Sequence, residues 1–218
     1  MDALLLDLDE TLYPRGNGVL QRTDRRIAAW VAARLGVSEE EANRLRFELW
    51  QSHGTTLRGL VERYGIEPGD YLEVVYRTDL SDLLQPDPAL RALLGRLPGR
   101  KAVFTNAPRA HARQVLELLD VHDAFEDLIA IEDLDLVPKP APEAYARALA
   151  RVGVEAARCA FVDDSLANAR AAARAGLRAV WLAPSGTRAE AGVGTEGIAV
   201  IESLAELEPL LGAGLPRA

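Results

Sequence analysis

Two pairs of carboxylates follow short apolar runs in this sequence. Asp7 and Asp9 come after the first run, and the adjacent Asp163 and Asp164 come directly after a later one. Because burying an unpaired charge is costly, we expect these side chains where a strand leaves its sheet. Neighbouring carboxylates repel each other, and a hard divalent cation would relieve the repulsion. The pairs therefore indicate a cation site, although one Asp of each pair would also serve as an ordinary cap.

Three further polar residues lie at comparable points of the chain. Thr105 and Asn106 end an apolar run, where a hydroxyl and an amide suit either a phosphoryl oxygen or a helix cap. Lys139 stands between two prolines, whose rings fix the local chain and would allow an ammonium aimed inward. The alternative for Lys139 is a solvated loop charge. Asn168, one turn beyond the second acidic pair, is expected near the same site.

Short apolar runs without polar alternation predict the strands that must position these groups. The runs are Ala3–Leu8, Ala102–Thr105, Leu128–Ile131, Ala160–Val162, Ala179–Leu182 and Ile198–Ile201. Helical segments lie between most of them, and several have clear start or stop signals. These signals are Asp87-Pro88, Pro108, Pro142 and Gly176. The alternation predicts an α/β fold with a doubly wound, mainly parallel sheet, in which the strand ends meet at one crevice.

Residues 14–85 differ from the rest because they contain no convincing buried strand. Four helices are expected there. We predict them from Thr23 to Leu35, from Ser38 (with Glu41 as a capping box) to Trp50, from Thr55 or Thr56 to Tyr64, and from Pro68 to Tyr76. The sequence therefore predicts a core of residues 1–13 and 86–218, with an all-helical cap of residues 14–85 inserted after the first strand.

Composition narrows the class of protein. The 218 residues are 49% hydrophobic and 27% charged, with a formal net charge of -8. This balance argues against a nucleic-acid polymer or an anionic membrane as partner. Cys159 is the single cysteine, which excludes an intramolecular disulfide. We see neither a signal peptide nor an apolar run of the ~20 residues that would span a membrane. A cytoplasmic monomer or homodimer is expected.

The order and spacing of these motifs resemble the haloacid dehalogenase-like hydrolase superfamily. The matching features are D-x-D-x-T at Asp7–Thr11, then Thr105, Lys139 and the Asp163-Asp164 pair. The predicted helical insertion occupies the position of that superfamily's cap. Longer strings are similar to the pyrimidine 5'-nucleotidase subfamily. These strings are Leu6–Pro14, His53–Leu60 and Val162–Gly176.

The resemblance implies a magnesium-dependent phosphatase. Asp7 would attack phosphorus and form an aspartyl phosphate, and Asp9 would act as general acid and then as general base. Mg²⁺ would be held by the Asp7 carboxylate, the Asp9 carbonyl and Asp164, with Asp163 beside them. The presence of Asp9 favours phosphoryl transfer over dehalogenation, because a departing halide needs no proton. It does not separate a phosphatase from a phosphomutase.

The same resemblance assigns the remaining site residues. Thr105 and Asn106 would hold phosphoryl oxygens, and Lys139 would offset the negative charge of the nucleophile and the phosphate. In the cap, His53, Thr55 and Thr56 are candidate specificity residues, with Arg58 beside them, and helix capping is their alternative role. Trp30, Trp50 and Tyr64 have amphipathic helical spacing and are expected in the core of the cap.

The substrate is expected to be a small phosphorylated metabolite. Nucleoside monophosphates, pyrimidine nucleotides above all, are the leading candidates, and the alternative is a broad phosphatase of sugar phosphates and related metabolites. A hypothesis of another class is a catalytically inactive, phosphate-binding regulatory protein. The intact acidic residues and Lys139 count against it. The segment 184–197 is expected to be a surface loop, and the tail from Gly212 is expected to be frayed.

Overall fold

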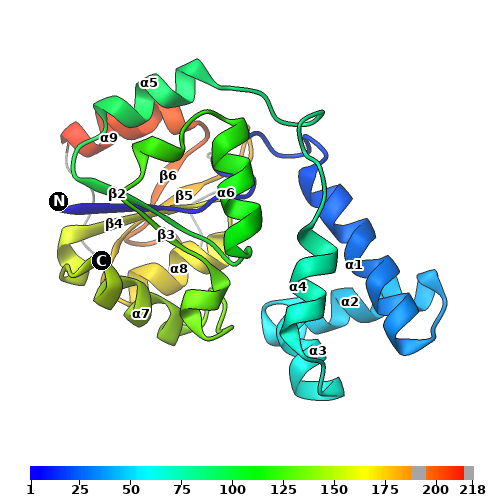
Figure 1. Cartoon of the computed structure of the whole chain (residues 1–218). Helices are drawn as coiled ribbons and strands as arrows, with labels where there is room; N and C mark the ends of the chain where they lie inside the picture. Colours follow the sequence, from blue (N-terminus) through cyan, green and yellow to red (C-terminus); the bar gives the residue numbers. More distant parts are fainter. Residues whose placement is uncertain (188–194, 214–218) are drawn as a thin grey trace.

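A single parallel sheet organises the larger part of the molecule, as the computed structural model of the chain shows for residues 1–187 and 195–213 (Figure 1). The six strands are β1 (Ala3–Leu6), β2 (Arg100–Phe104), β3 (Asp127–Ile129), β4 (Cys159–Asp163), β5 (Arg178–Leu182) and β6 (Ala199–Ile201). Their order is β3-β2-β1-β4-β5-β6, and every neighbouring pair is parallel. The predicted α/β class and all six predicted strands are confirmed.

Alternation along β1 explains why both faces of the sheet are covered. Leu4 and Leu6 pack in one hydrophobic cluster, whereas Leu5 packs in the cluster on the opposite face. Successive side chains of a strand point to opposite faces, so a strand that is apolar throughout needs a helical layer on each side. The sequence run that opens the chain is therefore suited only to the centre of a two-sided sheet.

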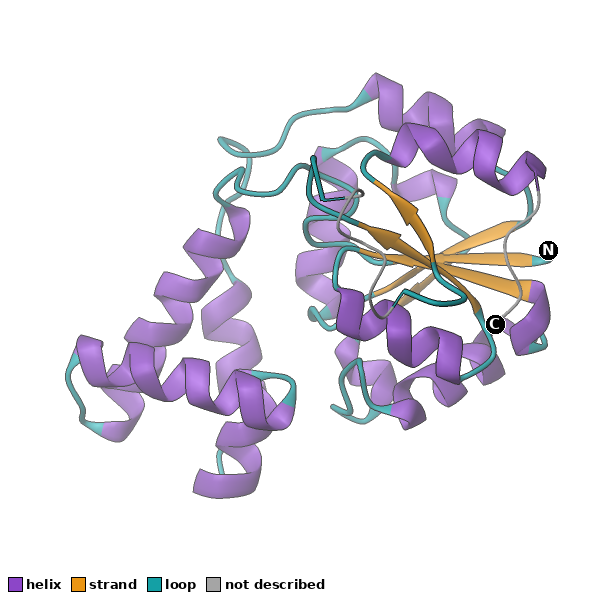
Figure 2. Cartoon of the chain, turned by 180° about the vertical axis from the view of Figure 1, so that it is seen from behind, coloured by secondary structure: helices purple, strands orange, loops and turns teal. Residues whose placement is uncertain are grey.

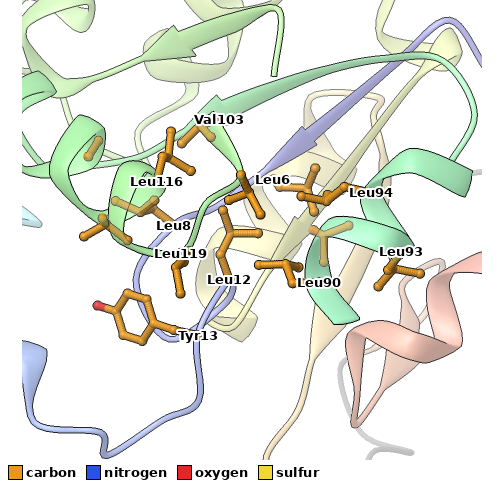
Figure 3. Close-up of a cluster of buried hydrophobic side chains, with 14 of the residues drawn as sticks. Leu6, Leu8, Leu12, Tyr13, Leu90, Leu93, Leu94, Val103, Leu116 and Leu119 are labelled. Carbon is orange, nitrogen blue, oxygen red and sulfur yellow. The ribbon is translucent and has the colours of Figure 1, made fainter. Parts of the chain in front are cut away.

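Five helices provide these two layers (Figure 2). On one face lie α5 (Pro88–Arg96), α6 (Arg109–Leu118) and α9 (Leu207–Ala213), and on the other lie α7 (Pro142–Val152) and α8 (Leu166–Arg174). Figure 3 shows the first cluster, in which Leu8 and Leu12 pack with leucines of α5 and α6. The ring of Tyr13 lies at the edge of this cluster, with its hydroxyl pointing away from the leucines (Figure 3).

Four helices between β1 and α5 form a separate unit beside the sheet (Figure 1). They are α1 (Val19–Leu35), α2 (Glu39–His53), α3 (Thr56–Tyr64) and α4 (Pro68–Tyr76), and they enclose their own hydrophobic cluster. This confirms the predicted helical cap after β1. The division at residues 13 and 85 stays a prediction.

Local signals placed most helix ends correctly. Ser38 accepts a hydrogen bond from the Glu41 N–H, and Thr55 accepts one from the Arg58 N–H, so both are the predicted N-caps. The prediction for Thr23 is wrong. Helix α1 begins at Val19, and Thr23 is buried one turn inside it. The N-cap of α1 is Gly18, whose backbone is left-handed at φ 104°. Because glycine has no side chain to cap the helix, this start left no capping signal in the sequence.

Two of the three expected cap-core aromatics are exposed. Trp30 packs against Tyr71 with ring centroids 5.2 Å apart, as predicted. Trp50 and Tyr64, however, are 52% and 41% exposed, so that prediction is wrong for both. Helical spacing identifies one face of a helix, but it does not tell whether protein or open space covers that face.

Other sequence predictions concern the ends of the chain and its surroundings. Cys159 is buried, as expected. Part of the expected surface loop, residues 188–194, and the end of the expected frayed tail, residues 214–218, lie outside the described residues, and α9 extends to Ala213. Within the described ranges, no helix has the length and apolar character needed to cross a membrane.

Candidate active site

The predicted acidic residues meet at the carboxyl edge of the sheet, between its two central strands. Asp7 directly follows β1, and its N–H donates to the Val162 carbonyl at 2.9 Å. Asp163 is the last residue of β4. The chain crosses from one half of the sheet to the other between these strands, and such a switch point is where open α/β sheets bind ligands.

Lys139 is buried at the centre of this group. Its side chain is 1% exposed, and its ammonium donates to Asp7 Oδ1 at 2.7 Å, to Asp163 Oδ2 at 2.8 Å and to the Phe104 carbonyl at 2.7 Å. All three N–H donors are therefore satisfied. Burial lowers the pKa of Lys139, but the carboxylates of Asp163 and Asp7 outweigh it and raise that pKa. The solvated-loop alternative for Lys139 is wrong.

Asp163 has both carboxylate oxygens engaged within the protein. Oδ1 accepts from the Ser165 N–H at 2.8 Å, and the Asn168 amide donates to both oxygens at 3.1 Å. Asp163 also accepts from the Lys139 ammonium, so its carboxylate holds Lys139 and Asn168 in fixed orientations. Asn168 lies at the site, as the sequence predicted.

The carboxylates of Asp7, Asp163 and Asp164 form a candidate cation site. One ligand oxygen of each lies within 4.8 Å of the others. Burial, and then the charge of Asp163, raise the pKa of Asp164 to about 6. Burial likewise raises the pKa of Asp7, in spite of Lys139. The buried carboxylates thus outnumber the one buried ammonium, and a divalent cation with oxygen ligands fits this excess of negative charge.

Arg15 is a neighbour of this group that sequence reasoning missed. Its guanidinium contacts the Asp164 carboxylate at 2.8 Å and donates to the Asp164 carbonyl at 2.6 Å. Arg15 lies in the first connection between sheet and cap, which gave no sequence signal for a site.

Asp9 is held by two residues to which the sequence assigned no role. The Tyr13 hydroxyl donates to Asp9 Oδ1 at 2.6 Å, and His111 Nε2 lies 3.1 Å from the same oxygen. Burial alone would raise the pKa of Asp9, but His111 and then Tyr13 lower it below its ordinary value. One signal for His111 exists in the sequence: it is a polar residue on the buried face of α6, one turn before Val115.

Thr105 and Asn106 lie beside this group at the end of β2. Thr105 is buried, and its Oγ1 accepts from the Ala107 N–H at 2.9 Å. Asn106 donates from Nδ2 to the Lys139 carbonyl at 3.0 Å and accepts at Oδ1 from the Lys139 N–H at 2.8 Å. The predicted contacts of both residues with phosphoryl oxygens stay predictions.

A cavity of about 470 Å³ separates the cap from the core and reaches Asp9. Thr55 and Thr56 line it, although the Thr56 hydroxyl donates to the Arg46 carbonyl at 3.1 Å. His53 is absent from the described lining and instead contacts Ser52 and Glu62. A larger cavity of about 780 Å³ lies beside α5, and none of the nucleophile, general acid and lysine candidates is among its described lining residues. The smaller cavity is therefore the candidate substrate site.

Several curated proteins are similar to this chain, and two of the three described next are phosphatases by name. Phosphate metabolism protein 8 of Saccharomyces cerevisiae is 29% identical over 78% of the chain, which spans 58% of the yeast protein. The glyceraldehyde 3-phosphate phosphatase of Methanopyrus kandleri is 28% identical, with 80% of this chain and 81% of that protein covered. The phosphoglycolate phosphatase of Pectobacterium atrosepticum is 25% identical, with 96% and 92% covered.

Two solved structures of the same fold match this chain over nearly its whole length and over nearly their own. The HAD phosphatase from Thermococcus onnurineus has a TM-score of 0.68 and 24% identity, with all of both chains covered. The HAD-hydrolase YfnB from Bacillus subtilis, bound to magnesium, has a TM-score of 0.62 and 20% identity, with 96% of this chain and 98% of that one covered. At these identities the likeness concerns the fold.

The family comparison covers most of the sequence. Residues 1–176 match the haloacid dehalogenase-like hydrolases, and this range contains every residue of the site described above. The chain therefore belongs to the haloacid dehalogenase-like hydrolase family.

Proposed function

We propose that this protein is a magnesium-dependent phosphatase of small phosphorylated metabolites that works through a phosphorylated Asp7. The observation that carries the proposal is the buried Lys139 ammonium, 2.7 Å from Asp7 and 2.8 Å from Asp163, with Asp9 two residues beyond the nucleophile. Phosphoryl transfer needs a nucleophile, a fixed positive charge beside it and a separate acid, and Asp7, Lys139 and Asp9 would supply these three groups.

In the first step, a carboxylate oxygen of Asp7 bonds to phosphorus while the ester P–O bond breaks. His111 and Tyr13 lower the pKa of Asp9, but the negative charge of a bound phosphate ester raises that pKa again and favours the protonated carboxyl group. The departing oxygen takes this proton from Asp9, and the product alcohol leaves. Lys139 has its charge fixed before the reaction, so it offsets the negative charge at Asp7 without reorganisation.

In the second step, water attacks the phosphorus of the aspartyl phosphate. Asp9, now a carboxylate, takes a proton from that water while the bond between phosphorus and Asp7 breaks. Inorganic phosphate leaves, and Asp7 returns to its starting form. Asp9 thus serves both steps, and the protons balance over one cycle.

Asp7 and Asp164, with the Asp9 carbonyl, are the residues that would hold Mg²⁺. The cation neutralises phosphate charge and orients the ester when bound. Asp163 has both oxygens engaged by Lys139, Ser165 and Asn168, so we assign it to holding Lys139 in place. A cation next to Asp7 also favours the ionised nucleophile, against the rise in its pKa that burial causes.

The relatives support a broad substrate class. Two of them are named for phosphoglycolate and for glyceraldehyde 3-phosphate, both small phosphorylated metabolites. A cavity of about 470 Å³ accommodates molecules of this size and larger. We therefore favour a metabolite phosphatase over a dedicated nucleotidase.

One observation favours nucleoside monophosphates as a second candidate. Phe47 and Trp50 line the cavity with ring centroids 5.7 Å apart, and both are about half exposed, at 51% and 52%. Exposed aromatic faces stack well on nucleobases. This candidate agrees with the likeness of the motif strings to pyrimidine 5'-nucleotidases.

The test is phosphate release from a panel of sugar phosphates, 2-phosphoglycolate, glyceraldehyde 3-phosphate, UMP, CMP, dTMP, AMP and GMP. Each is measured with Mg²⁺, with EDTA and with Asp7→Asn, and the exposed Asp123→Asn serves as the matched control. We expect release that needs the metal and disappears only in Asp7→Asn. No release from any ester by folded, metal-loaded protein would favour the regulatory, phosphate-binding alternative.

A further inference from the structure

His111 is a buried histidine whose main polar contact is with the proposed general acid. It lies on α6, is 2% exposed, and is 102 residues from Asp9 in sequence. A carboxylate oxygen can only accept, so Nε2 donates to Asp9 Oδ1 across their 3.1 Å separation. The fold brings the two together because α6 begins beside the carboxyl end of the sheet.

The other ring nitrogen shows that His111 is not explained by packing alone. Nδ1 is buried, and none of the described residues is its hydrogen-bond partner. A buried polar atom without a partner lowers stability, so an apolar side chain would suit this position better if packing were its role.

Two donors hold a single oxygen of Asp9. Tyr13 donates to Oδ1 at 2.6 Å, and His111 donates to the same atom. Among the described residues, none donates to Oδ2. The carboxyl group is thus fixed through one oxygen, and the other is left to exchange a proton with the ester.

The cap contacts this arrangement directly. Tyr76, the last residue of α4, packs its ring edge-on against His111, with centroids 5.3 Å apart. Tyr13 lies where the chain leaves the sheet for the cap. Both groups that hold Asp9 are therefore next to the segments that carry the cap.

We propose that His111 is a positioning residue that, with Tyr13, fixes the Asp9 carboxyl for proton transfer to the leaving oxygen. The inference rests on the proposed function and deepens it. His111 acts through Asp9, so its loss should matter most where the leaving group needs a proton.

The experiment compares two esters in wild type, His111→Leu and His111→Gln. p-Nitrophenyl phosphate releases a stable phenolate, whereas glycerol 1-phosphate releases an alkoxide that must be protonated. We expect His111→Leu to lower kcat/KM for glycerol 1-phosphate by about 100-fold, the usual scale of general acid catalysis, and for the aryl ester by less than about threefold. His111→Gln, which keeps a donor, should recover most of the loss.

Two further variants make the result decisive. Tyr13→Phe removes the second donor to Asp9 but keeps the ring, and it should show the same dependence on the leaving group. It replaces His111→Leu as the test if that variant does not fold. Val115→Ala, buried on the same helix, should leave the ratio of the two kcat/KM values unchanged. Equal losses on both esters, or a change in KM alone, would overturn the inference. If wild type releases phosphate neither from these two esters nor from any ester of the panel above, the proposed function fails instead.

Discussion

The side-chain amide of Asn106 forms two hydrogen bonds with the backbone of Lys139. The Asn106 side chain donates to the Lys139 carbonyl at 3.0 Å and accepts from the Lys139 N–H at 2.8 Å. The contact fixes the backbone at the point from which the lysine side chain enters the buried site. It also connects the end of β2 with the loop before α7.

Asn106→Ala is therefore expected to weaken both structure and catalysis. Losing two hydrogen bonds that hold a partly buried backbone should lower the free energy of unfolding by about 2 kcal/mol. Because the ammonium is then less well placed, kcat should fall as well. Urea unfolding and steady-state kinetics measure the two effects. Unchanged stability with lost activity would indicate that the amide acts on the phosphate alone.

Lys139→Met should have the largest effect on the stability of the metal-free protein. The change leaves the buried carboxylates of Asp7 and Asp163 without their shared cation, and removing one partner of such a buried group costs about 3–5 kcal/mol. Chemical unfolding in EDTA measures it. Lys101→Met is the matched control, since among the described residues the ammonium of that lysine donates to two backbone carbonyls, at 3.2 and 3.3 Å, and to no carboxylate. A similar loss in both variants would contradict the role given to Lys139.

The elements that local signals specify were predictable from the sequence. Pro88 and Pro142 begin α5 and α7, and the apolar runs form the strands of the sheet. The parallel sheet then places Asp7 and Asp163 together, because carboxyl ends of parallel strands share an edge. The flanking prolines of Lys139 left both an inward and a solvated ammonium open, and only the family resemblance placed this lysine at the site.

Contacts between distant segments were not predictable in the same way. The bond between His111 and Asp9 depends on how α6 packs, which no local pattern specifies. The exposure of Trp50 depends on the open space between cap and core, since the same helical spacing would suit a covered face. Sequence periodicity gives the face of a helix, and tertiary packing decides what lies against it.

Magnesium should stabilise the protein more at neutral pH than at acidic pH. In the metal-free protein the pKa of Asp164 is raised from 3.8 to about 6, so its contribution to stability is full below pH 4 and is lost as the pH rises through 6. Metal binding needs the ionised carboxylate. The gain in Tm on adding Mg²⁺ should therefore be small at pH 5 and grow up to about pH 7.

Thermal unfolding at several pH values, with Mg²⁺ and with EDTA, checks this expectation. Asp164→Asn removes the titrating group and should both reduce the gain and flatten its dependence on pH. A gain in wild type that stays constant from pH 5 to pH 8 would show that Asp164 is not a ligand of the metal.

Trp50→Ala should separate the two candidate substrate classes. Because Trp50 is 52% exposed, the change should leave folding intact, and it removes a stacking face from the cavity. Loss of stacking on one base typically costs enough to lower kcat/KM about tenfold. We expect that decrease for UMP and CMP, with little change for 2-phosphoglycolate, which has no ring. Tyr64→Ala, an exposed aromatic of α3 outside the described cavity lining, is the control. If Trp50→Ala lowers kcat/KM for both kinds of ester equally, the aromatic pair does not recognise the leaving group, and the nucleotide candidate loses the observation that favours it.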